Sequence, residues 1–250
     1  MERLKNKVAL ITGGTSGIGL ATAEDFTRQG ATVIITGRYK NTVDETVKKL
    51  GSNAYGIVSD SGKMHDILQL KDQVMGFIPK IDILFVNAGY GKFAPVESVA
   101  EAQFDELYNV LVKGVFFTVQ QLLPVINEGG SVVLNTSVVT GYGSPNASVY
   151  SAAKAAVQSF VKTFAAEFTE KKIRVNGISP GYTKTNGFSK AGFSSEQIDG
   201  VIQSILPTLP LKRFAQPGEI ARVVSFLASD DASYLHATEI VADGGYLHIK

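Results

Sequence analysis

The chain has 250 residues, 44% of them hydrophobic, and its 24 Lys and Arg against 23 Asp and Glu leave a formal net charge of +1. This balance, without any long basic run, excludes an electrostatic nucleic-acid-binding surface. The absence of Cys excludes disulfides, zinc fingers and thiol nucleophiles, and the three histidines are not spaced as metal ligands, so no metal site is expected.

The apolar stretches are short. The first follows a basic N-terminus but covers only Val8–Ile11 before a glycine pair, which is shorter than the ~7–15-residue apolar core of a secretory signal. No apolar run approaches the ~20 residues of a membrane span. We therefore expect a cytoplasmic protein that binds neither membranes nor nucleic acids.

Short apolar segments alternate along the chain with longer segments of helical periodicity. The apolar segments are rich in β-branched residues and mostly non-alternating, which is typical of strands covered on both faces. They comprise Val8–Thr12, Thr32–Thr36, Tyr55–Val58, Ile81–Asn87, Ser131–Ser137, Arg174–Ser179 and Glu239–Ala242. The expected helices comprise Gly17–Gln29, Thr42–Leu50, Ala102–Ile126, Val149–Thr169 and Pro217–Ser229.

This alternation predicts an α/β fold, a doubly wound Rossmann-type parallel sheet of seven strands with helices on both faces. No linker or repeat divides the chain, so residues 1–250 are expected to form a single domain. Residues 186–209 fit the alternation least well, and they contain three glycines and a short amphipathic piece. Because open sheets bind ligands beyond the carboxyl ends of their strands, we expect a substrate lid there; the alternative is a loose surface loop.

A glycine-rich turn follows the first expected strand and opens the first helix. Such a turn lets the backbone approach a pyrophosphate closely, and the helix N-terminus offers free N–H groups. The strict Gly-x-Gly-x-x-Gly pattern is not met, because Thr22 stands where the third glycine belongs, so a purely structural turn is the alternative reading. The expected phosphate-binding residues are Gly13, Thr15, Ser16, Gly17, Ile18 and Gly19.

The second expected strand ends in Gly37 and Arg38, where an NAD site would carry an acidic residue for the ribose hydroxyl. A guanidinium can bind a 2′-phosphate through two hydrogen bonds, whereas a carboxylate would repel it. The sequence therefore favours NADP(H) over NAD(H). The alternative is that Arg38 stacks on adenine and tolerates either cofactor.

Tyr150 and Lys154 lie four residues apart on an expected helix, so their side chains share one face. A nearby cation lowers the pKa of a phenol from its usual value of about 10, which would fit Tyr150 for acid–base work. Ser137 ends an apolar strand, where active sites form in open sheets. Tyr246 and Lys250 have the same spacing but follow the last expected strand, so we prefer Tyr150.

Together these features resemble the short-chain dehydrogenase/reductase family over Val8 to Gly245. The resemblance implies a catalytic tetrad of Asn109, Ser137, Tyr150 and Lys154. It also implies cofactor contacts from Asp60, Ser61, Asn87, Ala88, Gly89, Pro180, Gly181, Thr183 and Thr185, in addition to Tyr150 and Lys154. The chain departs from the family pattern at Val86 and at Leu235–Ala237, which puts the C-terminal packing in doubt but not the chemistry.

The resemblance further implies hydride transfer between the nicotinamide and a carbonyl carbon. Tyr150 would act as general acid or base, Ser137 would polarise the carbonyl, Lys154 would lower the pKa of Tyr150, and Asn109 would hold a water that leads to solvent. It also implies a homotetramer, or a dimer, through the helices expected at 102–126 and 149–169 and the strand expected at 239–242.

We expect an uncharged, fairly apolar ketone or aldehyde, or the corresponding alcohol, as the small-molecule substrate. The residues expected to line its pocket are Val138, Val139, Tyr142, Tyr182 and Phe188. A reductase of 3-oxoacyl groups on a carrier is the main alternative, although no basic docking patch is evident. A non-catalytic NADP-sensing regulator is a further alternative, which the complete tetrad disfavours.

Overall fold

The computed structural model describes residues 2–185 and 194–249 and contains a parallel sheet of seven strands. The strands lie in the order β3-β2-β1-β4-β5-β6-β7, and helices cover both faces, which confirms the predicted fold class. The strands are β1 (Val8–Ile11), β2 (Thr32–Gly37), β3 (Ala54–Val58), β4 (Ile81–Val86), β5 (Ile126–Asn135), β6 (Arg174–Pro180) and β7 (Glu239–Ala242).

Strand β1 is the third strand of the sheet and pairs with both β2 and β4. Leu10 is aligned with Ile34 on one side and with Leu84 on the other, and all three side chains are fully buried. The chain builds the sheet outward to β3 and then returns to build the other half from β4. At this reversal the loops after β1 and β4 run to opposite faces, which opens a crevice at the carboxyl ends of the strands.

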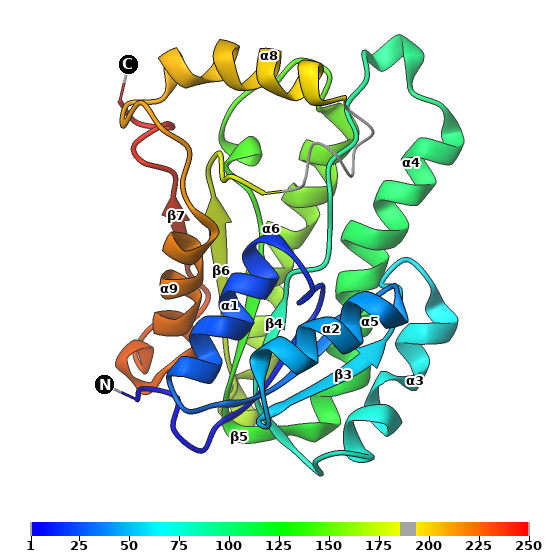
Figure 1. The fold of residues 1–250 in the computed structure, drawn as a ribbon, viewed down its shortest axis with the longest axis vertical. Helices are drawn as coiled ribbons and strands as arrows, with labels where there is room; N and C mark the ends of the chain where they lie inside the picture. Colours follow the sequence, from blue (N-terminus) through cyan, green and yellow to red (C-terminus); the bar gives the residue numbers. More distant parts are fainter. Residues whose placement is uncertain (1, 186–193, 250) are drawn as a thin grey trace.

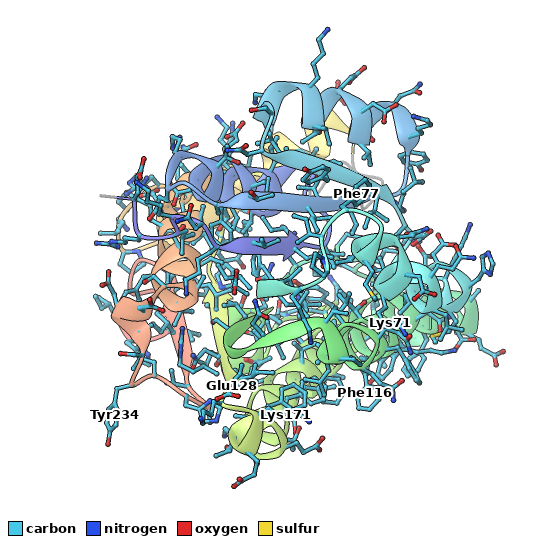
Figure 2. All side chains as sticks on the ribbon, turned by 90° about the horizontal axis from the view of Figure 1, so that it is seen from below. Lys71, Phe77, Phe116, Glu128, Lys171 and Tyr234 are labelled. Carbon is cyan, nitrogen blue, oxygen red and sulfur yellow. The ribbon has the colours of Figure 1, made fainter. Side chains whose placement is uncertain are left out.

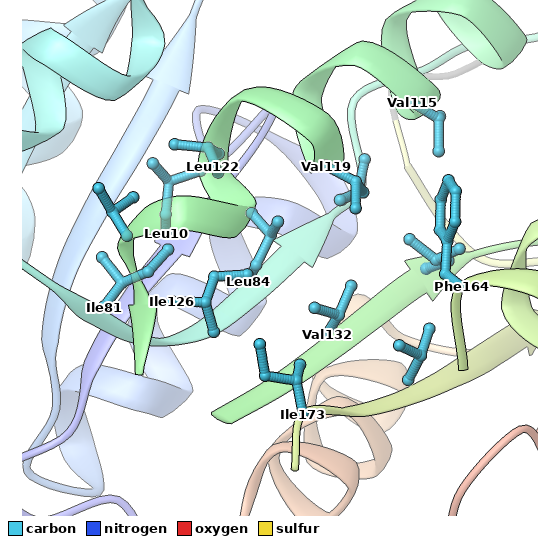
Figure 3. Packing of buried hydrophobic residues seen from close by; sticks show 14 of the residues in the cluster. Leu10, Ile81, Leu84, Val115, Val119, Leu122, Ile126, Val132, Phe164 and Ile173 are labelled. Atoms are coloured by element: carbon cyan, nitrogen blue, oxygen red, sulfur yellow. The ribbon is translucent and has the colours of Figure 1, made fainter. Parts of the chain in front are cut away.

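Two layers of helices enclose the sheet because each helix has one apolar face to bury. Helices α1 (Gly17–Arg28), α2 (Lys40–Leu50) and α9 (Pro217–Ala228) contribute to one buried cluster, which includes Phe26 and Ile220. Helices α3 (Met64–Met75), α5 (Gly114–Leu122) and α6 (Ser148–Phe168) contribute to the other. Figure 3 shows Val119 and Leu122 of α5 facing the strands of the central sheet.

Helix α8 (Ser195–Ile205) lies at the end of the molecule toward which β6 points, across the top of Figure 1. It matches the amphipathic piece expected within 186–209. Residues 186–193, the first part of the expected lid, lie outside the described residues. The position of α8 brings Val201 and Ile205 to the carboxyl-end crevice.

The helical segment expected at 102–126 is present, but it is not one regular α-helix. The segment consists of α4 (Glu101–Tyr108), a π-helical turn (Asn109–Lys113), α5 and a short 3-10 turn (Leu123–Val125) that contains Pro124. Proline lacks the N–H that an α-helix needs, so the helix ends there and β5 begins at Ile126, five residues earlier than Ser131. Helix α3 was not predicted, although Ile67, Leu70 and Val74 have helical spacing.

Within the described residues, the structure has no helix long and apolar enough to cross a membrane. The same part of the chain contains no group of three or more His, Cys, Asp or Glu side chains that could hold a metal ion.

Candidate active site

A cavity of about 550 Å³ lies at the carboxyl ends of the strands. The loops that follow β1 to β6 form its walls, together with the first turns of α6 and one face of α8. Parallel strands place their carboxyl ends at one edge of the sheet, so residues from distant parts of the sequence meet here. The cavity is the place where the residues expected from the sequence converge.

The glycine loop between β1 and α1 forms one wall. Gly13 has a φ of +64°, and a Cβ on it would lie 2.9 Å from the Cα of Ala88. A Cβ on Gly19 would lie 2.3 Å from the carbonyl oxygen of Gly13, so no side chain fits at either position. Gly13, Thr15, Ser16, Gly17 and Ile18 line the cavity. Gly19 does not; it allows the close packing underneath the loop.

The Asn-Ala-Gly element after β4 holds this loop from below. The hydroxyl oxygen of Thr12 accepts hydrogen bonds from the backbone N–H groups of Asn87 (2.9 Å) and Ala88 (3.0 Å). The side-chain amide of Asn87 donates to the carbonyl oxygens of Thr12 (3.0 Å) and Gly13 (3.3 Å). These bonds fix the turn in the shape that faces the cavity. Asn87, Ala88 and Gly89 themselves line it.

Gly37, Arg38, Asp60 and Ser61 line the other part of this wall, next to the ends of β2 and β3. A Cβ on Gly37 would lie 2.6 Å from Cγ2 of Thr15, so a larger residue would displace the glycine loop. The Asp60 carboxylate accepts a hydrogen bond of 3.0 Å from the backbone N–H of Gly62, which fixes its direction.

Tyr150, Lys154 and Ser137 meet at the middle of the cavity. Ser137 follows β5 and accepts a hydrogen bond of 3.3 Å from the backbone N–H of Val139. Tyr150 and Lys154 lie one turn apart on α6, with the Lys154 Nζ 6.0 Å from the centre of the Tyr150 ring. The Lys154 Nζ donates a hydrogen bond of 2.7 Å to the backbone carbonyl oxygen of Asn135 at the end of β5.

Burial acts on both ionisable groups in this constellation. It raises the pKa of Tyr150, and a hydrogen bond with Ser137 acts in the opposite direction. It lowers the pKa of Lys154 to about 8. The sequence predicted that Lys154 lowers the pKa of Tyr150, but in the structure burial outweighs other influences on this phenol, and the partner that lowers its pKa is Ser137.

Asn109 does not line the cavity. It opens the π-helical turn, whose residues Leu111 and Val110 pack with Val149 and Ala153 of α6. The wider π turn lies behind the helix that carries Tyr150 and Lys154. The structure therefore places Asn109 beside α6 and not among the cavity-lining side chains.

The apolar end of the cavity is formed by Val138, Val139, Tyr142 and Tyr182, as expected, whereas Phe188 lies outside the described residues. The hydroxyl oxygens of Tyr142 and Tyr182 are 3.3 Å apart. The ring of Tyr246 packs edge-on against both, at 5.3 Å from each ring centre. Tyr246 thus supports the wall from the C-terminal segment, away from Tyr150.

The Pro-Gly element after β6 completes the wall: Pro180, Gly181, Thr183 and Thr185 line the cavity. Gly181 packs closely on the C-terminal segment, because a Cβ on it would lie 2.7 Å from the Cα of Asp243. This contact joins the end of β6 to the segment that follows β7.

Several lining residues were missed by the sequence analysis. Tyr90 directly follows the Asn-Ala-Gly element, and Gly91 and Phe93 come shortly after it; this position after β4 is the signal that could have identified them. Thr36, Ser59, Asn135 and Thr136 stand at or just after the ends of β2, β3 and β5. Val201 and Ile205 belong to the segment expected as a lid, although they were not named individually. The remaining residues have no sequence signal of their own, because tertiary packing alone brings them to the cavity: Val110, Ser144, Pro145, Asn146 and Phe214.

The cavity fits a dinucleotide. Its glycine loop leads into the N-terminus of the twelve-residue helix α1, which has no acidic side chain in its first turn to oppose a phosphate. Two buried side-chain atoms of lining residues, Ser59 Oγ and Asn135 Oδ1, have no hydrogen-bond partner among the described residues. Such atoms favour a polar ligand that satisfies them.

Comparison with known proteins gives matches along nearly the whole chain. A family model described as enoyl-(acyl carrier protein) reductase matches residues 13–247. A 3-oxoacyl-[acyl-carrier-protein] reductase of Thermotoga maritima is 37% identical over 248 residues, which cover 97% of this chain and 98% of that protein.

Two solved structures have the same fold over the same length. L-sorbose reductase from Gluconobacter frateurii, complexed with NADPH and L-sorbose, has a TM-score of 0.92 and 29% identity, with 100% of both chains covered. A short-chain dehydrogenase/reductase family protein has a TM-score of 0.83 and 35% identity, covering 98% of this chain and 99% of that one. The predicted resemblance is confirmed, and the chain belongs to the short-chain dehydrogenase/reductase family.

Proposed function

We propose that this protein is an NADPH-dependent carbonyl reductase, or alcohol dehydrogenase in the reverse direction, formed by one domain over residues 1–250. One observation carries the proposal: Ser137, Tyr150 and Lys154 line the same cavity as the glycine loop and Arg38. A proton donor thus lies in one continuous space with a site suited to a dinucleotide.

The bound nicotinamide cofactor would supply the hydride in this reaction. Tyr150 gives a proton to the carbonyl oxygen in reduction and takes one from the alcohol in oxidation. Ser137 hydrogen-bonds to the substrate oxygen and to Tyr150, and so places the two for proton transfer. Lys154, held by the backbone carbonyl oxygen of Asn135 one turn along α6 from Tyr150, would bind the nicotinamide ribose. We also propose that Asn109, which lies behind α6, holds a water molecule that connects Lys154 to bulk solvent.

Arg38 supports NADPH as the preferred cofactor. It lines the cavity next to Gly37, and no acidic residue takes the place of either at the end of β2. A guanidinium there suits a 2′-phosphate. The similar L-sorbose reductase was solved with NADPH, which agrees with this assignment. NAD(H) is the alternative cofactor that the activity measurement below would reveal.

An uncharged ketone or aldehyde is the proposed substrate. Among the described lining residues, the charged side chains are Arg38, Asp60 and Lys154, and none belongs to the apolar end with Val138 and Tyr142. A charged substrate would lack a partner there. A 3-oxoacyl group on a carrier is a second candidate, favoured by the Thermotoga maritima relative and by the description of the family model.

We further propose a homo-oligomer, either dimer or tetramer. Phe116 of α5 packs against Phe160 and Phe164 of α6 at ring-centre distances of 5.7 Å, and Phe160 and Phe164 stack at 5.1 Å. Figure 2 shows Phe116 near the edge of the molecule. Phe116 and Phe160 are partly exposed, whereas Phe164 below them is buried, and exposed aromatic rings on two helices suit contact with a second copy. Light scattering after size-exclusion chromatography measures the state, and a monomer at micromolar concentration would contradict it.

The experiment that tests the function follows absorbance at 340 nm with the purified protein, a panel of uncharged ketones and aldehydes, and NADPH or NADH in parallel. Faster oxidation of NADPH supports the proposal. Faster oxidation of NADH would show that Arg38 does not determine the cofactor preference, and would leave the rest of the proposal standing. If only carrier-linked 3-oxoacyl substrates are reduced, the second candidate replaces the first, and cofactor binding without any turnover would favour a sensing protein.

A further inference from the structure

Arg38 lies between two aromatic rings at the rim of the cavity. Its guanidinium carbon is 5.5 Å from the centre of the Tyr39 ring and 5.8 Å from that of the Tyr90 ring. Both distances lie within the range of cation–π attraction. Tyr39 is 64% exposed, whereas Tyr90 is partly buried and lines the cavity together with Arg38. Tyr90 is therefore the ring that holds the inner side of the guanidinium.

The sheet order brings Arg38 and Tyr90 together, although they lie far apart in the sequence. Arg38 follows β2 and Tyr90 follows β4, and these two strands flank β1. The contact between them therefore spans the end of β1, where the glycine loop begins. A ligand that extends from the glycine loop toward the end of β2 therefore lies next to Arg38 and Tyr90.

Tyr90 is fixed from behind by helix α4. Its hydroxyl donates a hydrogen bond to one carboxylate oxygen of Glu106, and the ammonium of Lys92 donates to the other oxygen. Burial raises the pKa of Tyr90, and the bond and charge of Glu106 raise it further. Hydrogen bonds from Lys92 and Tyr90 hold the pKa of Glu106 below its usual range. Tyr90 is thus a neutral donor, and Glu106 a carboxylate, at neutral pH.

The pairing of Glu106 with Lys92 also reduces the negative charge near Arg38. The Glu106 carboxylate is close enough to Arg38 to interact with it electrostatically, and on its own it would weaken the attraction of an anion. The ion pair with Lys92 offsets that charge. Arg38 therefore keeps a positive field at the rim, and Tyr90 supplies a ring for it to rest on.

We propose that Tyr90 is a positioning residue for cofactor selectivity, which holds the guanidinium of Arg38 where it binds the 2′-phosphate of an adenosine dinucleotide. A guanidinium whose face rests on a ring has its N–H edges free for two hydrogen bonds to a phosphate. A guanidinium without that support samples many rotamers, and binding must then order it. This inference rests on the proposed preference for NADPH.

The test measures the dissociation constants of NADP⁺ and NAD⁺ by isothermal titration calorimetry, so that catalysis does not enter. The readout is the ratio of the NAD⁺ constant to the NADP⁺ constant. We expect Tyr90→Leu to lower this ratio about two- to fivefold, which corresponds to the strength of an exposed cation–π pair. Tyr90→Phe keeps the ring but loses the hydrogen bond to Glu106. Its ratio should therefore stay closer to that of the wild type than the ratio of Tyr90→Leu.

A second background shows whether Tyr90 acts through Arg38. Arg38→Ala should abolish most of the selectivity, and adding Tyr90→Leu to Arg38→Ala should then change the ratio less than about 1.5-fold, because coupled residues are not additive. Phe104→Leu is the matched control: Phe104 lies on α4 with Glu106 but stacks on Tyr108, away from Arg38. It should leave the ratio unchanged.

The outcomes separate this inference from the proposed function. A wild-type ratio of one or below overturns both the NADPH preference and the role of Tyr90. A high ratio that falls in Arg38→Ala but not in Tyr90→Leu overturns the role of Tyr90 alone. An equal loss from Tyr90→Leu on both backgrounds also overturns it, because Tyr90 would then contact the cofactor without acting through Arg38.

Discussion

The ammonium group of Lys154 donates a hydrogen bond of 2.7 Å to the backbone carbonyl oxygen of Asn135, and so ties α6 to the end of β5. Lys154 is only 5% exposed. A buried ammonium next to one carbonyl oxygen is poorly solvated, which is why burial lowers the pKa of Lys154 to about 8. The site therefore holds a positive charge in the interior at a cost to stability.

Lys154→Met should stabilise the fold while it removes activity. The pKa of an unfolded lysine is about 10.4, so the unfolded chain binds this proton more tightly than the folded one. The charge thus destabilises the folded state fully below pH 8, and this penalty disappears as the pH rises toward about 10.4. We expect the free energy of unfolding at pH 7 to rise by about 1–3 kcal/mol, allowing for the lost hydrogen bond.

Urea denaturation at pH 7 and pH 10 measures this effect. The gain should shrink at the higher pH, and the exposed Lys162 on the same helix is the control, since Lys162→Met should change stability little at either pH. A loss of stability in Lys154→Met at pH 7 would contradict the argument.

Tyr150→Phe should separate binding from chemistry. The variant keeps the ring that packs edge-on against Phe93 at 5.6 Å but lacks the hydroxyl that gives the proton. We expect carbonyl reduction to fall by about 10²–10⁴-fold, while the dissociation constant of NADPH stays within about threefold. Tyr234→Phe is the control, because Tyr234 is fully exposed and projects from the surface in Figure 2. Retained reduction in Tyr150→Phe would show that another group gives the proton.

Ser137→Ala should move the pH profile of alcohol oxidation to higher pH. Burial raises the pKa of Tyr150, and the hydrogen bond from Ser137 partly offsets that rise, so its loss leaves a still higher pKa. Oxidation needs the deprotonated phenol, and its rate rises with pH up to that pKa. Profiles of kcat/KM measure the shift and must extend above pH 10, because burial already raises the wild-type pKa of Tyr150 above its usual value. Ser137→Thr keeps the hydroxyl and should retain the wild-type midpoint; a shift of Ser137→Ala toward lower pH would refute this coupling.

Gly19→Ala should damage the cofactor site although Gly19 does not line it. The added Cβ would lie 2.3 Å from the Gly13 carbonyl oxygen and 2.5 Å from the Asn87 amide nitrogen, so the glycine loop must move. We expect a loss of about 1–3 kcal/mol in stability and weaker binding of NADPH by at least tenfold. Thermal unfolding and calorimetric titration measure the two effects.

Gly200→Ala is the matched control for that substitution. Gly200 lies within α8 and has no described atom within 4 Å of an added Cβ. Alanine is the better helix former, so this variant should gain about 0.5–1 kcal/mol and bind NADPH normally. Equal effects of the two alanines would show that the contacts below the loop do not matter.

The sequence could predict the fold class because the pattern of a buried parallel sheet is local. Each strand, such as β2 from Thr32 to Gly37, is a short apolar segment, and each is separated from the next by a segment of helical period. The π-helical turn that begins at Asn109 could not be predicted, because such a turn has no distinct composition and arises where α4 and the turn itself pack against α6.

The glycine loop, Arg38, Ser137, Tyr150 and Lys154 were identifiable by residue type and spacing alone, since each follows a strand or opens a helix. Their convergence is a property of the sheet order. The pKa values of Tyr150 and Lys154 could not be predicted from spacing. Their separation of four residues on one helix suggested that Lys154 controls the pKa of Tyr150. In the structure, burial is the largest influence on both pKa values, and the surrounding walls of the cavity determine that burial.

By itself, then, the sequence determined the alternating elements and the residue types that carry acid–base chemistry and phosphate binding, because these depend on neighbours along the chain. Only the tertiary structure decided that Tyr90 lies against Arg38 and that α8 reaches the cavity, because these contacts depend on which strands lie side by side. Burial, and with it every shifted pKa in the site, follows from packing between segments far apart in the sequence.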